Sequence, residues 1–175
     1  MKNGLNFILF QSLWISCILG AANHVIWPAV LIISSMLGVF LFPAFRHKKD
    51  ILFLSVCIIM GFILDSLLAY LQLIDYNYDY GLNQTAPFWI LFLWAGFALT
   101  LNHSMSWLLK KPKLGTLFIL IGAPLSYYSA EKLMAIKINE TIITLCLISV
   151  LWLLVYHIIL AINGFFFRST ELNHV

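Results

Sequence analysis

Charged residues are scarce in this chain of 175 residues. Asp, Glu, Lys and Arg together account for 10% of the sequence, whereas hydrophobic residues account for 62%. A soluble domain of this length leaves roughly 30% of its chain's surface in water, and that surface needs more polar groups than this sequence holds. The composition therefore excludes an ordinary soluble domain and is typical of a helical protein that crosses a membrane several times.

Cysteine is scarce too, and the common catalytic motifs are missing. The three cysteines, Cys17, Cys57 and Cys146, lie in separate apolar runs without C-x-x-C spacing, which predicts neither a disulfide framework nor a metal site. The patterns GxSxG and HExxH are absent. The formal net charge of +3 is too small to indicate a nucleic-acid-binding surface. We therefore expect no metal, no cofactor and no nucleic-acid partner.

What is present is a series of six apolar runs separated by short connections. About 20 apolar residues are needed to cross a hydrocarbon layer of about 30 Å as an α-helix. The sequence therefore predicts an all-α, polytopic transmembrane bundle, in one integral membrane domain that covers residues 1–175, with no internal repeat. The predicted spans lie near residues 5–22, 27–45, 51–74, 87–109, 114–133 and 141–167.

Basic residues are concentrated on one side of this predicted topology. Only Lys132 and Lys137 lie on the side that holds the connections after the first, third and fifth spans. Positive charge marks the cytoplasmic ends of membrane spans, so both termini are expected in the cytoplasm. The other side holds the remaining basic residues, which are Lys2, Arg46, Lys48, Lys49, Lys110, Lys111, Lys113 and Arg168.

Several polar residues lie within the predicted spans, where they are costly unless they face the bundle interior and find partners. Their distances from the span ends, at about 1.5 Å per residue, sort them into two layers. The layer near the cytoplasmic side is expected to hold Gln11, Asn102 and His103. The layer near the outer side is expected to hold Asp65, Ser126 and Tyr127, with Lys132 above them.

Asp65 is the strongest functional candidate in the sequence. An isolated carboxylate in an apolar span must be neutralised, paired or hydrated. If the protein is catalytic, Asp65 is expected to act as the acid or base, with the other outer-layer residues positioning an anionic headgroup. His103 is the second catalytic candidate and forms a separate polar site with Asn102. The alternative at each position is structural, an interhelical hydrogen bond that contributes about 0.6–2 kcal/mol.

Four segments carry a resemblance to a known family, and they span the chain up to Lys132. They are "NFILFQSLWISCILGAAN", "ILDSLL", "LNHSMSW" and "GAPLSYYSAEK". Together they resemble a bacterial family of small, multi-pass inner-membrane proteins of unknown function, for which no catalytic residues are established. Its members are often encoded near cyclopropane-fatty-acid-synthase-like methyltransferases. The resemblance implies a location in the bacterial inner (cytoplasmic) membrane and lipid-modifying enzymes as partners.

Three functions are compatible with these features. The leading hypothesis is a protein of the inner membrane that assists the modification or handling of membrane lipids. The second is a small proton-coupled transporter, in which Asp65 and His103 are successive stations of a polar path. The third is a non-catalytic scaffold that holds a partner enzyme at the membrane. The sequence leaves open whether the protein is an enzyme.

Overall fold

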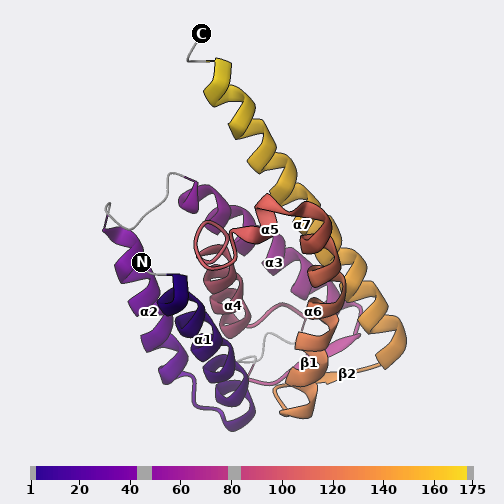
Figure 1. The fold of residues 1–175 in the computed structure, drawn as a ribbon. Helices are drawn as coiled ribbons and strands as arrows, with labels where there is room; N and C mark the ends of the chain where they lie inside the picture. The colour runs from indigo at the N-terminus through magenta and orange to yellow at the C-terminus, as the bar shows by residue number, and fades with distance from the viewer. Residues whose placement is uncertain (1–2, 43–48, 79–83, 173–175) are drawn as a thin grey trace.

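A computed structural model describes residues 3–42, 49–78 and 84–172, with side chains up to residue 165. These residues form seven helices and two short strands (Figure 1). The elements in chain order are α1 (Asn3–Asn23), α2 (Trp27–Leu41), α3 (Asp50–Tyr70), β1 (Ile74–Tyr76), α4 (Phe88–Ala98), α5 (Trp107–Lys110), α6 (Pro112–Lys132), β2 (Ile136–Ile138) and α7 (Thr141–Leu172).

The long helices form a bundle of hairpins. Helix α1 packs against α2 and α4, α3 packs against α4, and α6 packs against α7. The two strands lie at one end of the bundle, while α5 and the start of α3 lie at the other (Figure 1). Helix α7 continues past α5, so its C-terminal part projects beyond the bundle (Figure 1).

Three of the described helices are long and apolar enough to cross a membrane. They are α1, α3 and residues Thr141–Phe165 of α7, which correspond to the first, third and sixth predicted spans. Helices α2 and α4 are apolar but shorter, and Arg46 and Lys48, beyond α2, lie outside the described residues. Helix α6 is as long as α3 but less apolar, because it contains Lys113, Glu131 and Lys132 as well as hydroxyl-bearing residues at 126–129.

The fourth predicted span, residues 87–109, is not one continuous helix. Helix α4 ends at Ala98 and α5 begins only at Trp107, with turns between them. The hydroxyl of Thr100 donates to the carbonyl of Phe97 at 2.6 Å. Side chains that bond to nearby carbonyls offer the backbone an alternative to helical bonding, and this segment is rich in them.

Backbone bonds in the same segment have left the helical pattern. The amide groups of His103 and Met105 both donate to the carbonyl of Thr100, at 2.9 Å each. The amide of Ser104 donates instead to the side chain of Asn6 on α1, at 3.2 Å. The polar residues of this apolar run therefore shorten α4 and turn the chain back toward α6.

The two strands depart from the all-α prediction. They pair antiparallel, in the register Ile74↔Ile138, Asp75↔Lys137 and Tyr76↔Ile136. Their side chains alternate, with the isoleucines and Tyr76 buried and the charged pair exposed, as expected for a sheet with one covered face. The sheet therefore turns Tyr76 into the bundle. Tyr80, from the same connection, lies outside the described residues.

The chain contains an internal structural repeat, contrary to the sequence-based prediction. Helices α3 and α6 both have 21 residues, and α6 starts 62 positions after α3. The same interval separates β1 from β2. It also separates residues with a left-handed backbone conformation. Gln72 and Tyr78, which follow α3, have φ values of 56° and 59°. Met134 and Glu140, which follow α6, have φ values of 59° and 49°.

Reciprocal hydrogen bonds join the two repeats at the strands. The side-chain amide of Asn77 donates to the carbonyl of Met134 at 2.6 Å, and that of Asn139 donates to the carbonyl of Gln72 at 2.9 Å. Their backbone amides also form a reciprocal pair, with the carbonyls of Ala135 and Leu73. Equivalent groups that bond each other in both directions indicate a local two-fold relation between α3–β1 and α6–β2.

Candidate functional site

The site is built around Asp65, which lies in the last third of α3 and is 0% exposed. The hydroxyl groups of Tyr76 and Tyr127 donate to its Oδ1 at 2.7 and 2.6 Å. The indole Nε1 of Trp94 donates to its Oδ2 at 2.7 Å. The donors come from β1, α6 and α4, so the carboxylate joins four elements of the fold.

Local packing explains how these donors reach the carboxylate. The buried face of β1 directs Tyr76 inward. Helix α4 approaches α3 closely at Gly61, where an added Cβ would lie 2.2 Å from ring atoms of Trp94. Trp94 also stacks on Trp152 of α7, with ring centroids 4.2 Å apart and an interplanar angle of 15°. The indole that bonds Asp65 is therefore held by contacts with both α3 and α7.

The side chain of Asp65 is stabilised by neutral hydrogen-bond donors, and no cation lies beside it among the described side chains. All three of its hydrogen-bond donors are neutral groups, and neither of the ion pairs found among the described side chains includes it. Burial, and then the nearby charge of Asp65, raises the pKa of Tyr76 well above its usual range. That phenol therefore keeps its proton at neutral pH and remains a donor.

Asp65 borders a cavity of about 90 Å³. Apart from Asp65 and Ser126, its walls are apolar or aromatic. An apolar wall with a few convergent polar groups is the usual construction of a small-molecule site. The aromatic residues that line it are Phe10, Trp14, Tyr76, Trp89, Trp94, Phe97, Tyr127 and Trp152.

A second cavity of about 300 Å³ adjoins the first. The two share Phe10, Trp14, Phe97, Ser126 and Trp152 in their walls. The outer part of the second cavity is lined by residues of α1 and α6 that are exposed on the surface of the bundle, such as Gln11 and Leu125.

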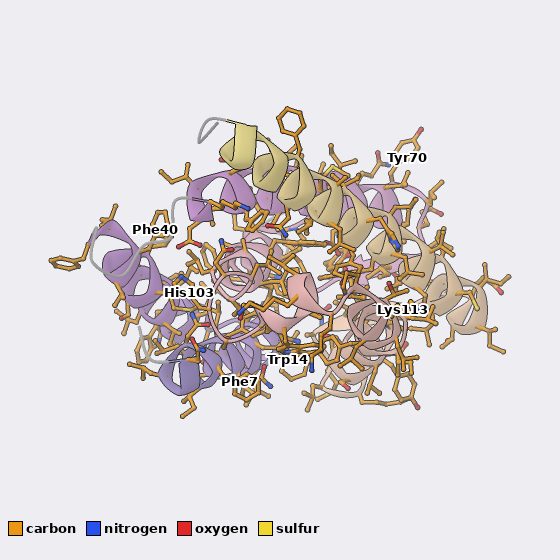
Figure 2. The ribbon with its side chains drawn as sticks, turned by 45° about the horizontal axis from the view of Figure 1, so that its top comes forward. Phe7, Trp14, Phe40, Tyr70, His103 and Lys113 are labelled. Carbon is orange, nitrogen blue, oxygen red and sulfur yellow. The ribbon has the colours of Figure 1, made fainter. Side chains whose placement is uncertain are left out.

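A single side-chain hydrogen bond bridges α1 and α6 beside this cavity. Trp14 lies between the two helices (Figure 2), and its Nε1 donates to the hydroxyl of Ser126 at 2.9 Å. Helix α1 packs chiefly on α2 and α4, whereas α6 packs on α7, α5 and β2. The bundle is therefore loosely closed between α1 and α6, where the second cavity reaches exposed residues.

A second polar cluster surrounds Asp50, the first residue of α3, at the opposite end of the bundle. Asp50 is 0% exposed. The side-chain amide of Asn102 donates to its Oδ1 at 2.7 Å, and Nε2 of His103 lies 3.1 Å from its Oδ2. The positive end of the α3 dipole also favours a carboxylate there. Asn102 and His103 thus hold the broken end of α4 against the start of α3.

The structure separates the predicted residues into the two expected layers, with two exceptions. Asp65 contacts Tyr127 directly and shares its cavity with Ser126, while Asn102 and His103 share Asp50. Gln11 is exposed and lines the outer cavity. The α1 residue found in the layer of Asn102 and His103 is Asn6, whose side-chain oxygen accepts a hydrogen bond from the hydroxyl of Ser104.

Lys132 is the second exception. Its side chain is 61% exposed, 3.9 Å from Glu131 and 4.8 Å from the ring centre of Tyr128. This position at the end of α6 fits a lysine that extends toward the membrane surface. Lys132 does not line either cavity at the carboxylate.

Sequence reasoning missed four residues of these sites: Asn6, Asp50, Tyr76 and Trp94. Asp50 carried a detectable signal, since it is the only acidic residue in a basic connection, "RHKKD", directly before an apolar run. Only the strand pairing and the α3–α4 contact bring Tyr76 and Trp94 to Asp65.

Among the described residues, no group of three His, Cys, Asp or Glu side chains is placed to hold a metal ion. What the Asp65 site offers is one buried carboxylate, three fixed donors and an aromatic chamber next to a larger apolar one. This arrangement can bind an amphiphilic molecule, and the carboxylate can exchange a proton with it.

These features define a class of largely helical proteins with several apolar helices, as membrane proteins have, and buried carboxylate sites. The chain belongs to a family whose model, described as "Protein of unknown function (DUF2878)", matches residues 3–158. That match covers both carboxylate sites and confirms the expectation of a family of unknown function. No curated protein and no solved structure gives a significant match to the chain.

Proposed function

We propose that this protein handles membrane lipids or related amphiphiles, by taking an apolar chain from the bilayer into the two adjoining cavities and holding its polar end beside Asp65. We place it in the bacterial inner membrane with both termini in the cytoplasm. The observation that carries the proposal is the fully buried carboxylate at the inner end of an apolar chamber that borders α1 and α6.

The energetics favour a functional role for this carboxylate. An ionisable group inside an apolar bundle is costly and is kept in membrane proteins mainly at functional positions. Three neutral donors reduce that cost, but they leave a site able to bind or exchange a proton. We assign Asp65 as the group that recognises the polar end of the ligand, and as the acid or base if a reaction follows.

The outer cavity supplies the apolar part of the proposed site. Its volume of about 300 Å³ lies at the lower end of the range of small-molecule pockets. Gly122 and Ala123, two small residues of α6, make room for it. Because exposed residues of α1 and α6 line its outer part, an acyl chain would enter it from the bilayer in this proposal.

The carrier alternative finds less support. Asp50 and Asp65 are 15 residues apart on α3, which corresponds to roughly 22 Å along the helix. The buried positions between them on this helix are Phe53, Cys57, Gly61 and Leu64. This face of α3 therefore offers no series of polar groups along which a proton would move, and no specific observation favours the scaffold alternative.

Photolabelling tests the proposal. A fatty alcohol that carries a diazirine near the end of its chain is added to membranes, irradiated, and the labelled residues are mapped by mass spectrometry. We expect saturable labelling of the chamber walls on α1 and α6, competed by excess unlabelled alcohol. Labelling that is confined to outward-facing residues and does not saturate would contradict the proposal.

A blocking variant supplies the matched control. Ala123→Leu adds volume inside the outer cavity, whereas Ile121→Leu changes a residue of the same helix that is 57% exposed and does not line the cavity. We expect Ala123→Leu to remove the saturable labelling and Ile121→Leu to leave it intact. Comparative lipidomics of wild-type and deletion cells then identifies which lipid class the protein handles.

A further inference from the structure

The Asp65 site also carries information on the head group of its ligand. Resting on the function proposed above, we propose that the preferred ligand is an amphiphile with a protonated amine head that carries at least one N–H group, and that this head binds between Asp65 and the aromatic walls of the inner chamber.

The hydrogen bonds of Asp65 leave room for one more donor. A carboxylate has about four acceptor positions. Oδ1 accepts two hydrogen bonds, from Tyr76 and Tyr127, whereas Oδ2 accepts one, from Trp94. One acceptor position on Oδ2 therefore remains. Asp65 is buried, and it forms no ion pair with a cationic group among the described side chains. An ammonium N–H would supply both the donor and the missing positive charge.

The surrounding rings favour a cation over a neutral head. Ammonium groups are attracted to the faces of aromatic rings, most strongly to Trp, and the attraction grows when the site excludes water. The stack of Trp94 on Trp152 covers one face of each ring, so the attraction comes from other rings that line the chamber, among them Trp14 and Trp89. A carboxylate set in such an aromatic wall is the chemistry that recognises amines.

Trp152 adds an unused donor to the same wall. Its Nε1 is buried beside the hydroxyl of Tyr127 and forms no well-aligned hydrogen bond among the described residues. A buried donor without a well-placed acceptor destabilises the folded state. An oxygen one or two bonds from the amine of the ligand, such as a hydroxyl or an ester, would accept from it. The pair formed by Asp65 and Trp152 therefore matches a head group that has both an amine and an acceptor.

An anionic head, which the sequence suggested, fits this geometry less well. The only basic residue predicted to hold it, Lys132, is largely exposed and lies outside the walls of both chambers. Asp65 is instead the only Asp, Glu, Lys, Arg or His side chain in the walls of the inner chamber. Like charges at a buried site repel strongly, so an anion would be excluded unless Asp65 were protonated.

The size of the two chambers matches a small head and a longer chain. The inner chamber, at about 90 Å³, is smaller than the ~150 Å³ cavity known to hold a benzene molecule. It suits an ammonium head and excludes a bulky phosphodiester. The outer chamber, which shares five wall residues with it, is more than three times as large and would hold the first part of the chain.

Head-group competition on the unmodified, full-length protein tests the inference. The purified protein in uncharged detergent micelles at pH 7 is titrated with dodecylammonium, dodecanol or dodecanoate, which share one chain length, and saturable binding is measured by calorimetry against protein-free micelles. We expect dodecylammonium to bind at least about tenfold more tightly than dodecanol, and dodecanoate to bind most weakly. Equal affinities for all three would overturn the head-group inference while leaving the lipid-handling function in place. Saturable binding of none of them would overturn both.

Two variants assign the preference to the carboxylate. Asp65→Asn keeps the shape of the side chain and removes its charge, and we expect it to bring the affinity for dodecylammonium down to that for dodecanol. Asp75→Asn removes an exposed carboxylate of β1 and serves as the control, with unchanged ranking. A ranking that persists in Asp65→Asn would contradict the assignment. If that variant fails to fold, the three-ligand ranking on the unmodified protein still decides the inference.

Discussion

Asp65 and Tyr127 occupy equivalent positions of the two structural repeats and are hydrogen-bonded to each other, 2.6 Å apart. The interval between them is 62 residues, the same interval that relates α3 to α6 and β1 to β2. Asp75 and Lys137, also 62 residues apart, lie directly opposite each other in the antiparallel pairing of β1 with β2. The buried site therefore lies where the two repeats meet.

The location of the site between the two repeats explains why it is asymmetric although the backbone elements around it are related by symmetry. The helices and their caps repeat, but the residues at the shared position differ, with an acceptor on α3 and a donor on α6. Trp94 and Trp152, from the helices that follow each repeat, stack on each other above this contact. The two repeats thus enclose one polar site, and each repeat contributes different residues to it.

We expect Asp65→Asn to impair function more than stability. Asn keeps the shape and can still accept hydrogen bonds at one atom, but it cannot ionise or exchange a proton. Complementation of a deletion phenotype should therefore fall strongly, and by more than the membrane abundance, which decreases only to the extent that the Trp94 indole loses its acceptor. The control is Asp75→Asn, whose exposed carboxylate bonds Asn139 at 3.2 Å. Full complementation by Asp65→Asn would remove the main functional candidate.

Gly61→Ala should destabilise the bundle. The added Cβ would lie 2.2 Å from ring atoms of Trp94, which is held by its bond to Asp65 and its stack on Trp152. Overpacking of this kind costs about 1–3 kcal/mol, and we expect a lower midpoint of thermal unfolding in detergent. Gly122→Ala is the matched control, because its Cβ would meet no atom closer than 3.8 Å. Equal midpoints for the two variants would argue against the close α3–α4 contact.

The sequence predicted some of these features well, because they depend on local pattern. Apolar runs located the helices, and depth along a helix brought Asp65 to the level of Tyr127. What it could not predict depends on contacts between distant segments. Tyr76 reaches Asp65 through the pairing of β1 with β2, and each strand is too short to be recognised alone.

The internal repeat escaped prediction for a different reason. The repeat consists of equal helix lengths, equal cap conformations and reciprocal backbone hydrogen bonds. Many different sequences can form these features, so they leave little trace in the residue types. Few residues are identical at equivalent positions, with Leu71 and Leu133, Ile74 and Ile136, and Asn77 and Asn139 as the clearest pairs near the caps. The break after α4 had a visible cause in its polar residues, but an apolar run of this length normally indicates an unbroken helix.

The topology is testable by cysteine labelling. In a background without the native cysteines, we expect Asn77→Cys and Asn139→Cys in intact cells to react with a membrane-impermeant maleimide, and Lys111→Cys to react only after the cells are opened. The strands and the start of α6 lie at opposite ends of the bundle (Figure 1), so the positions should report opposite sides. Reaction of Lys111→Cys in intact cells would reverse the assigned orientation.

The polar cluster around Asp50 should matter for stability and little for ligand binding. Asn102→Leu removes the amide that donates to Asp50 at 2.7 Å, and a buried acceptor that loses its donor costs about 1–3 kcal/mol. We expect a lower midpoint of thermal unfolding, with unchanged affinity for dodecylammonium, because the inner chamber lies near the other end of α3. Asn23→Leu is the control, since the exposed side chain of Asn23 bonds only the carbonyl of Leu19 in its own helix and its loss should change stability by less than about 0.5 kcal/mol. A ligand affinity that falls in Asn102→Leu without any loss of stability would instead assign the Asp50 cluster to the binding site and connect the two layers.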